Sequence, residues 1–168
     1  MVKDISESKL NKLLELNKKL VSENDHSKRM SLLSDSIKNM LNVDRCTVFM
    51  HDEQSSSFWS ICLDGISFLE VPDNTGMVGE VLKTQKTIIV NDAKNSPLFN
   101  DIIDTSIGYH TKNIMTMPIF GYDKKIIGVI QLLNKIDGSP GFTEEDQKVL
   151  SYVISHISAY LEVMMQEK

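Results

Sequence analysis

A lysine and an aspartate stand eleven positions apart in the stretch GVIQLLNKIDGSPGFTEEDQKVL, which runs from Gly128 to Leu150. Lys135 ends a run typical of a buried strand, and Asp146 follows a short glycine-containing loop. Charged side chains at such positions can pair with each other or transfer protons. Nothing between the two resembles a nucleophile with its base or a set of metal ligands, so the spacing alone assigns no reaction.

The residues around Asp146 carry the signals of a helix start. Thr143 and Asp146, three residues apart, form a capping-box pattern in which Asp takes the place of the usual Glu or Gln. Glu144 and Glu145 add negative charge where the helix dipole is positive. We therefore expect the last helix to begin at about Thr143, directly after the loop that follows Lys135.

Cysteine and histidine positions give no support for a metal centre. Cys46 and Cys62 each lie inside a strand-like run and form no Cys-x-x-Cys pair, so we expect buried, reduced thiols. The four histidines are scattered and lack metal-ligand spacing: His26, His51, His110 and His156. The sequence predicts no metal site and no catalytic residue.

Composition restricts the class of protein. A chain of 168 residues with 41% hydrophobic content suits one domain with a real core. A formal net charge of -5 disfavours nucleic-acid binding through phosphates. With no long apolar run and no signal-peptide core at the N-terminus, we expect a cytoplasmic protein without membrane contact.

Helical periodicity marks three long helices that must position these residues. The first spans about residues 4–21, with an apolar stripe of Leu10, Leu13, Leu14, Leu20 and Val21. It either packs on its own domain or pairs with a partner helix through Leu10, Leu13 and Leu20, with Asn17 fixing the register. The second helix ends near Asn42, and its seam consists of Met30, Leu33, Ile37, Met40 and Leu41. The third runs from about Thr143 to the end, with apolar positions Leu150, Val153, Ile154, Ile157, Leu161, Met164 and Met165.

Short runs rich in β-branched and aromatic residues indicate the strands: DRCTVFMHD, SFWSICLD, ISFLEVP, TIIV, NIMTMPIF and KIIGVIQLLN. On the first of these, Cys46 and Val48 alternate with Thr47 and Phe49, so we expect a sheet covered on both faces. A glycine-bearing turn after Pro72 leads into a short helix. The long irregular segment 91–113 is typical of a binding loop or lid.

The string GVIQLLNK, a glycine loop and F-T-E-E-D closely resembles the Asn-Lys…Phe-x-x-x-Asp-Glu signature of GAF domains in cyclic-nucleotide phosphodiesterases and related adenylate cyclases, with Gln147 in place of the final Glu. Three further blocks are similar to GAF segments and occur in the family order: DRCTVFMHD, VPDNTGMVGEVLKTQKTIIVNDAKNSPLFN and TSIGYHTKNIMTMPI. The resemblance covers roughly residues 25–162.

This resemblance implies an α+β, PAS-like fold. Its central antiparallel sheet would have about six strands, with the N- and C-terminal helices on one face and short helices and a ligand-binding lid on the other. Residues 1–24 would form an N-terminal helix and candidate dimerisation segment, 25–162 the GAF domain, and 163–168 the end of a C-terminal signalling helix. The structural motif would comprise Asn134, Lys135, Phe142 and Asp146, with Lys135 and Asp146 as an ion pair beside the ligand pocket.

The resemblance also implies a ligand, with cyclic AMP or cyclic GMP as candidates and no required cofactor. By position, the family's ligand contacts fall on Thr47, Asp64, Asp104, Thr111 and Gln131. Met77 and Val78 open a helix whose backbone N–H groups could hold a phosphate. Two departures bear on this ligand: Ile107 replaces a common lid threonine, and Lys94 replaces a common tyrosine. Lys94 either adds charge near the phosphate or lies in solvent.

Three functions compete. The first is a regulatory small-molecule sensor that passes a change through its terminal helices to an effector, for example a phosphodiesterase or cyclase domain linked to it in the natural protein. The second is a ligand-free dimerisation module, and in either case we expect a parallel homodimer through the first and last helices. The third is an enzyme, because one GAF branch reduces free methionine sulfoxide through lid cysteines. Residues 91–113 contain no cysteine, so we expect no enzyme activity from the domain itself.

Overall fold

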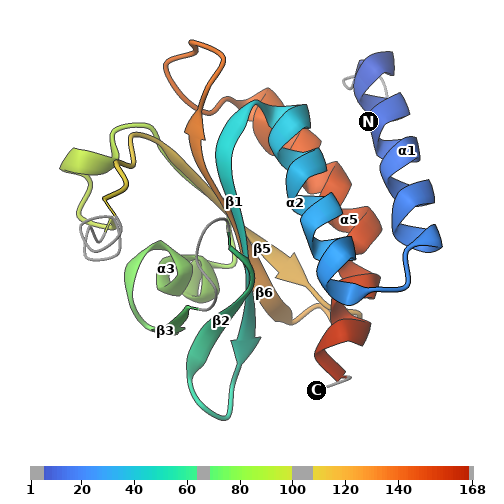
Figure 1. Cartoon of the computed structure of the whole chain (residues 1–168). Helices are drawn as coiled ribbons and strands as arrows, with labels where there is room; N and C mark the ends of the chain where they lie inside the picture. The colour runs from blue at the N-terminus through green and yellow to red at the C-terminus, as the bar shows by residue number, and fades with distance from the viewer. Residues whose placement is uncertain (1–5, 64–68, 100–107, 167–168) are drawn as a thin grey trace.

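The computed structural model describes residues 6–63, 69–99 and 108–166, which form an α+β fold around one antiparallel sheet (Figure 1). The helices are α1 (Glu7–Ser22), α2 (His26–Leu41), α3 (Gly76–Thr84), the 3-10 helix η2 (Ala93–Asn95) and α5 (Glu144–Gln166). The strands are β1 (Val43–Asp52), β2 (Ser57–Leu63), β3 (Glu70–Pro72), β4 (Ile88–Val90), β5 (Ile114–Phe120) and β6 (Ile126–Lys135). This architecture confirms the predicted fold class.

The six strands follow the order β3-β2-β1-β6-β5-β4, so the sheet is made of two three-stranded halves. The halves meet where β1 pairs with β6, with Phe49 opposite Val129 and Met50 opposite Gly128. A Cβ atom on Gly128 would lie 2.3 Å from the backbone oxygen of Phe49. Glycine is therefore required at this position for the two central strands to approach so closely.

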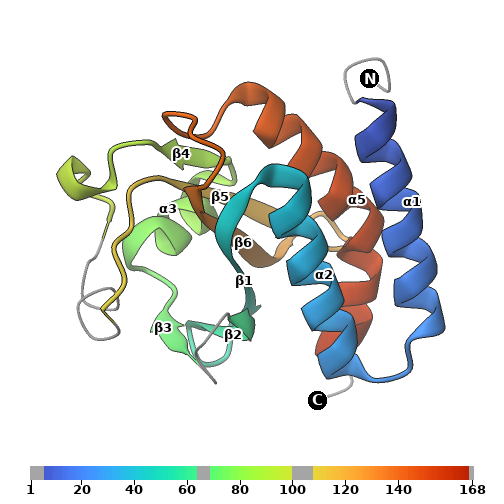
Figure 2. The same ribbon diagram turned by 45° about the horizontal axis from the view of Figure 1, so that its top comes forward.

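Both faces of the sheet are covered, as the alternation on β1 predicted. Helices α2 and α5 lie on one face with α1 outside them, and α3 lies on the other (Figures 1 and 2). Cys46, Val48 and Met50 belong to the large core cluster under α2 and α5. Phe49 points to the opposite side, where it packs with Val78 of α3. We call these two sides the helix face and the α3 face.

Helix α1 packs on its own domain, and the predicted stripe is right for Leu13 and Leu20 but not for all of its members. Leu13 and Leu16 are buried in the large core cluster, whereas Leu14 is 59% and Val21 is 82% exposed. The prediction that Leu14 and Val21 share the packed stripe was wrong, and Leu16 was missing from it. Packing against the rest of the domain sets the orientation of α1 about its axis, so that Leu13 and Leu16 face the core.

Local signals set the ends of the other long helices. The side chain of Asp25 accepts a hydrogen bond from the Lys28 N–H at the start of α2, and Asn42 ends that helix in the left-handed conformation (φ 53°). At the start of α5, the Thr143 N–H donates to Asp146 Oδ2 (2.9 Å) and the Asp146 N–H donates to Thr143 Oγ1 (3.2 Å). This reciprocal pair confirms the predicted capping box. Within the described residues, none of the helices is both long and apolar enough to cross a membrane.

Candidate functional site

A row of polar side chains crosses the middle of the sheet at one level. Thr47 on β1 is opposite Gln131 on β6, and Gln131 is opposite Thr116 on β5. Gln131 lies between Val129 and Leu133, which both pack into the small clusters beneath α3, so the row belongs to the α3 face. Gln131 Nε2 donates to Thr116 Oγ1 over 3.1 Å. Thr47 is 2% exposed and Thr116 is fully buried.

The start of α3 lies close to this row. Met77 packs with Ile114 and Leu133, which are two residues from Thr116 and Gln131 on the same strands. Both Met77 and Val78 are buried, so their side chains anchor α3 to the sheet and only their backbone N–H groups could serve a ligand.

No side chain from the N-cap position bonds to the first turn of α3. The hydroxyl of the N-cap residue Thr75 donates instead to the Pro72 carbonyl oxygen over 3.1 Å. The first amides of a helix have no partner within the helix itself. The start of α3 therefore combines the positive end of a helix dipole with amide donors that Thr75 leaves uncapped.

Two of the remaining predicted ligand residues, Thr111 and Lys94, are described by the structure. Thr111 is buried just before β5, and Lys94 is exposed on η2. The structure therefore places Thr47 and Gln131 side by side, and it places Lys94 at the surface. Asp64, Asp104 and the substituted lid position Ile107 lie outside the described residues.

Asn134 holds the segment that leads into β5. Its side-chain oxygen accepts hydrogen bonds from the N–H groups of Lys112 (2.7 Å) and Asn113 (3.2 Å), and its Nδ2 donates to the His110 carbonyl oxygen (2.9 Å). Asn134 itself adopts a left-handed backbone conformation with φ 61°. Asn tolerates this conformation better than most residues. It therefore suits this junction, where the side chain bonds the backbone of residues 110–113.

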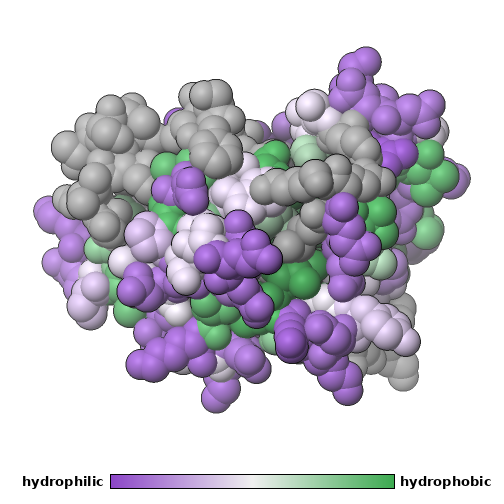
Figure 3. All heavy atoms as spheres, turned by 90° about the horizontal axis from the view of Figure 1, so that it is seen from below, coloured by the Kyte–Doolittle hydropathy of each residue, from purple (hydrophilic) through white to green (hydrophobic). Residues whose placement is uncertain are grey.

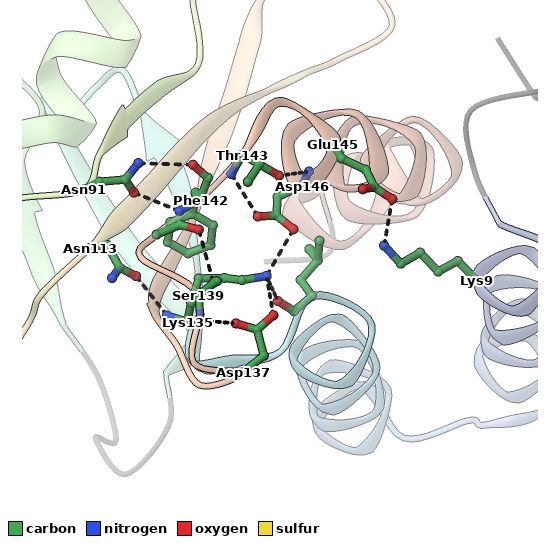
Figure 4. A network of polar contacts seen from close by, with 12 residues as sticks. Lys9, Asn91, Asn113, Lys135, Asp137, Ser139, Phe142, Thr143, Glu145 and Asp146 are labelled. Carbon is green, nitrogen blue, oxygen red and sulfur yellow. Dashed lines mark hydrogen bonds and ion pairs between the residues drawn. The ribbon is translucent and has the colours of Figure 1, made fainter.

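Lys135 joins three elements at the same junction (Figure 4). Its ammonium group lies 3.1 Å from Asp146 at the start of α5 and donates to the Leu41 carbonyl oxygen at the end of α2. It also lies 3.6 Å from Asp137 and 5.9 Å from the centre of the Phe142 ring. The ion pair between Lys135 and Asp146 that the family signature implied is thus present and connects β6 to α5, while the hydrogen bond to Leu41 connects β6 to α2. Hydrogen bonds from Ser139 hold the pKa of the exposed Asp137 below its ordinary value.

Asn91 and Phe142 make a second connection at this end of the sheet. Asn91 Nδ2 donates to the Phe142 carbonyl oxygen (3.1 Å), and the Phe142 N–H donates to Asn91 Oδ1 (2.8 Å). A Cβ atom on Gly141 would lie 2.2 Å from Asn91 Oδ1. The glycine before Phe142 therefore makes room for this pair of hydrogen bonds, which ties the end of β4 to the loop before α5.

Tyr109 connects the same region to the start of β1. Its hydroxyl donates to Asp44 Oδ2 (2.6 Å) and accepts from Asn134 Nδ2 (3.0 Å), while the Arg45 guanidinium lies 3.9 Å from the centre of its ring. Burial raises the pKa of the Tyr109 phenol far above its ordinary value, and the hydrogen bond to the Asp44 carboxylate raises it further.

Sequence reasoning missed four residues of this junction: Asp44, Asn91, Tyr109 and Asn113. A weak signal existed for the two asparagines, because Asn91 directly follows one predicted strand and Asn113 begins another. Amide side chains at strand ends can bond the backbone of a neighbouring segment. Their partners are far away in sequence, so this signal cannot predict which residues the two asparagines contact. Among the described residues, no group of three His, Cys, Asp or Glu side chains could hold a metal ion.

The sheet is covered by helices on one face and carries a polar row beside a short helix on the other, which defines the class of the fold as an α+β sheet domain. The family model of the GAF domain matches residues 25–161, and the chain belongs to that family. It is a regulatory domain related to those of phosphodiesterases.

A curated relative supports the phosphodiesterase connection. The chain is 34% identical over 125 residues to the dual 3',5'-cyclic-AMP and -GMP phosphodiesterase 11A of Takifugu rubripes. The match covers 66% of this chain but only 14% of the length of that phosphodiesterase.

Solved structures share the fold at low sequence identity. The GAF domain of a phosphoenolpyruvate-protein phosphotransferase from Coxiella burnetii has a TM-score of 0.81 at 16% identity, with 95% of each chain covered. The free methionine-R-sulfoxide reductase of Neisseria meningitidis, solved with its substrate, has a TM-score of 0.75 at 16% identity, with 98% of this chain and 96% of that one covered. At these identities the likeness establishes the fold alone.

Proposed function

We propose that this chain is a regulatory sensor domain that binds a cyclic nucleotide on the α3 face of the sheet. The observation that carries the proposal is the row of the buried Thr47 and Thr116 and the half-buried Gln131 next to the uncapped start of α3. The relationship to a phosphodiesterase named for cyclic AMP and cyclic GMP supports a cyclic nucleotide as the ligand.

In this arrangement the phosphate lies at the start of α3, near the N–H groups of Met77 and Val78. Backbone donors and the helix dipole stabilise an anion there without a basic side chain. The base lies toward Thr47 and Gln131, whose hydroxyl and amide groups can bond the edge of a purine. Burial of Thr47 makes this contact selective, because a buried polar group without a partner costs free energy.

The ligand change passes to the terminal helices through the junction of Asn134 and Lys135. Lys135 contacts both the end of α2 and the start of α5, so a shift of the β6 end moves both helices. An effector covalently linked to the domain would then respond to α5. We place the protein in the cytoplasm, where the buried Cys46 remains a reduced thiol.

Calorimetry with cyclic AMP and cyclic GMP tests the proposal. We expect heat of binding for at least one of them and weaker binding of the linear 5'-monophosphate, whose additional negative charge lacks compensation. Thr47→Val should weaken binding by about tenfold, the effect of losing one hydrogen bond of about 1.4 kcal/mol. Thr84→Val, at an exposed position on α3, is the matched control.

The absence of both heat and a thermal shift with either nucleotide at millimolar concentration would refute the ligand while leaving the family assignment intact. A ligand-free dimerisation module is the second candidate. The exposed Leu14 and Val21 on α1 favour it, because two apolar side chains on one face of a helix are suited to contact another protein surface.

A further inference from the structure

A cleft of about 470 Å³ lies between the tips of two hairpins and the C-terminal part of α5. Its apolar part consists of Trp59, Ile126 and Ile127, and four carboxylates line it: Asp52, Glu53, Asp123 and Glu162. Figure 3 views this end of the molecule and shows hydrophobic surface framed by hydrophilic side chains. We call this feature the acidic cleft.

The acidic cleft is strongly unbalanced in charge. Four carboxylates against the single ammonium of Lys125 leave a formal charge of -3 when His51 is neutral. Asp123 and Glu162 each accept a backbone N–H with one oxygen, from Lys125 and Tyr122 respectively. Within the part of the chain that the structure describes, their second oxygens accept no hydrogen bond, so the cleft suits a ligand that carries positive charge next to apolar groups.

The chain exposes such a surface on α1. Leu14 and Val21 are seven residues apart on one side of the helix, and Lys18 lies between them at i+4 from the first and i-3 from the second. All three side chains are exposed. We call Leu14, Lys18 and Val21 the α1 stripe, and it complements the acidic cleft in both apolar character and charge.

We propose that the α1 stripe of one copy of this chain docks into the acidic cleft of a second copy. A cleft of about 470 Å³ has room for a few side chains, which matches the size of the stripe. A two-fold axis would let each copy contribute its stripe to the cleft of the other, as closed dimers require. The contact involves neither the row of Thr47, Gln131 and Thr116 nor the start of α3, so it stands or falls separately from nucleotide binding.

This arrangement differs from the parallel pairing of α1 that the sequence predicted. Leu13, one of the expected seam residues, is buried in the protein's own core, and so is Leu161 of α5. If the α1 stripes of two copies paired in parallel, Lys18 of one copy would lie close to Lys18 of the other, and like charges repel. Placing Lys18 against carboxylates replaces that repulsion with attraction.

Sedimentation velocity on the nucleotide-free chain provides the first test. We expect concentration-dependent dimers whose dissociation constant rises with salt, because exposed charges are screened. The double variant Leu14→Ser/Val21→Ser and the variant Glu53→Lys should each weaken association by about tenfold or more. Glu144→Lys, the same charge reversal at the opposite end of α5, is the matched control and should associate like the wild type.

Mixing the two weakened variants distinguishes this contact from other dimers. The double variant retains an intact cleft and Glu53→Lys retains an intact stripe, so one stripe-cleft contact can form between them. We expect the mixture to associate more strongly than either variant alone. Trp59 is the single tryptophan and lines the cleft, so its emission should change as the mixed dimer forms.

Three results would overturn the proposal. The first is a wild-type chain that remains monomeric at high micromolar concentration. The second is a mixture that behaves as the sum of its two components. The third is loss of association in the α1 double variant with wild-type association in Glu53→Lys, which would mean that α1 pairs without the cleft. Unchanged thermal midpoints of all variants would confirm that each remains folded.

Discussion

At the scale of single residues, Lys135 is the group whose environment constrains the molecule most. Its side chain is 5% exposed, so the ammonium group has lost nearly all contact with water and depends on protein partners. Asp146, Asp137 and the Leu41 carbonyl oxygen provide them. Such a group holds its neighbours in place because every alternative arrangement leaves a buried charge without compensation.

Replacing Lys135 by alanine should therefore lower the free energy of unfolding by about 3 kcal/mol, because Asp146 is left buried without its cation. Chemical denaturation measures the loss. Lys86→Ala, at an exposed position, is the matched control and should change stability little. An unchanged denaturation midpoint in Lys135→Ala would mean that the ion pair does not stabilise the junction.

Tyr109 should make stability depend on pH in the alkaline range. Its pKa is raised in the folded protein, so above the ordinary phenol pKa of about 10 the folded state holds a proton that the unfolded state releases. The stability that depends on the protonated Tyr109 phenol is therefore fully present below about pH 10, and it declines as the pH rises further. Urea denaturation between about pH 9 and pH 11 should show a shallower decline for Tyr109→Phe than for the wild type. Equal slopes for the two proteins would contradict a raised pKa at Tyr109.

At the scale of elements, α1 has one face buried against the core and another face exposed to solvent. Leu16 faces the core and is 1% exposed, while Leu14, two residues earlier, faces solvent. The same helix thus anchors itself to the domain and presents the α1 stripe outward.

Truncating the two leucines should separate these roles. Leu16→Ala should cost about 2 to 5 kcal/mol of stability, because it leaves a cavity beneath α1. Leu14→Ala should change the stability of the monomer by less than about 0.5 kcal/mol, because its side chain is already in water. Thermal or chemical denaturation at low protein concentration measures both. Equal losses would show that α1 sits in a different rotation.

Elements whose signals are local could be predicted from the sequence, and contacts between distant segments could not. The six strands follow from short runs of β-branched residues, and the start of α5 follows from Thr143 and Asp146, three residues apart. The rotation of α1 was missed because a leucine-rich helix offers more than one apolar stripe, and only its neighbours select one. The pairs Tyr109 with Asp44 and Asn91 with Phe142 are 65 and 51 residues apart, beyond the reach of any spacing rule. The family signature was what connected Lys135 to Asp146.

At the scale of the whole molecule, the two proposals place nucleotide binding and dimer contact on separate surfaces. The proposed ligand row and the acidic cleft lie on different parts of the domain, and the only tryptophan packs against the helix-face core. Both faces depend on the central pairing of β1 with β6, which holds the two halves of the sheet together.

Gly128→Ala should test that dependence. The added methyl group would lie 2.3 Å from the Phe49 carbonyl oxygen, so the central strands must move apart and we expect a loss of about 3 kcal/mol or more. Gly138→Ala is the matched control. No atom lies within 4 Å of its Cβ position, so only its backbone conformation (φ 80°) should cost about 1 kcal/mol. Far-UV circular dichroism and Trp59 emission should follow one transition, and a similar small loss in both variants would refute a tight central contact.

The central β1–β6 pairing also decides when the chain can become native. Its two strands are separated by the whole of β2 to β5, so a nascent chain leaving the ribosome can form the β1–β2 hairpin early, but it cannot close the sheet until residues 126–135 have emerged. Helix α2 must wait as well, because Lys135 binds its last turn across 94 residues. We therefore expect folding to be slow for a domain of this size, with closure governed by long-range contacts and stable protection of residues 43–52 delayed until residues 126–135 have emerged. Protease protection of arrested nascent chains of increasing length would measure this delay, and protection of β1 before β6 has emerged would disprove it.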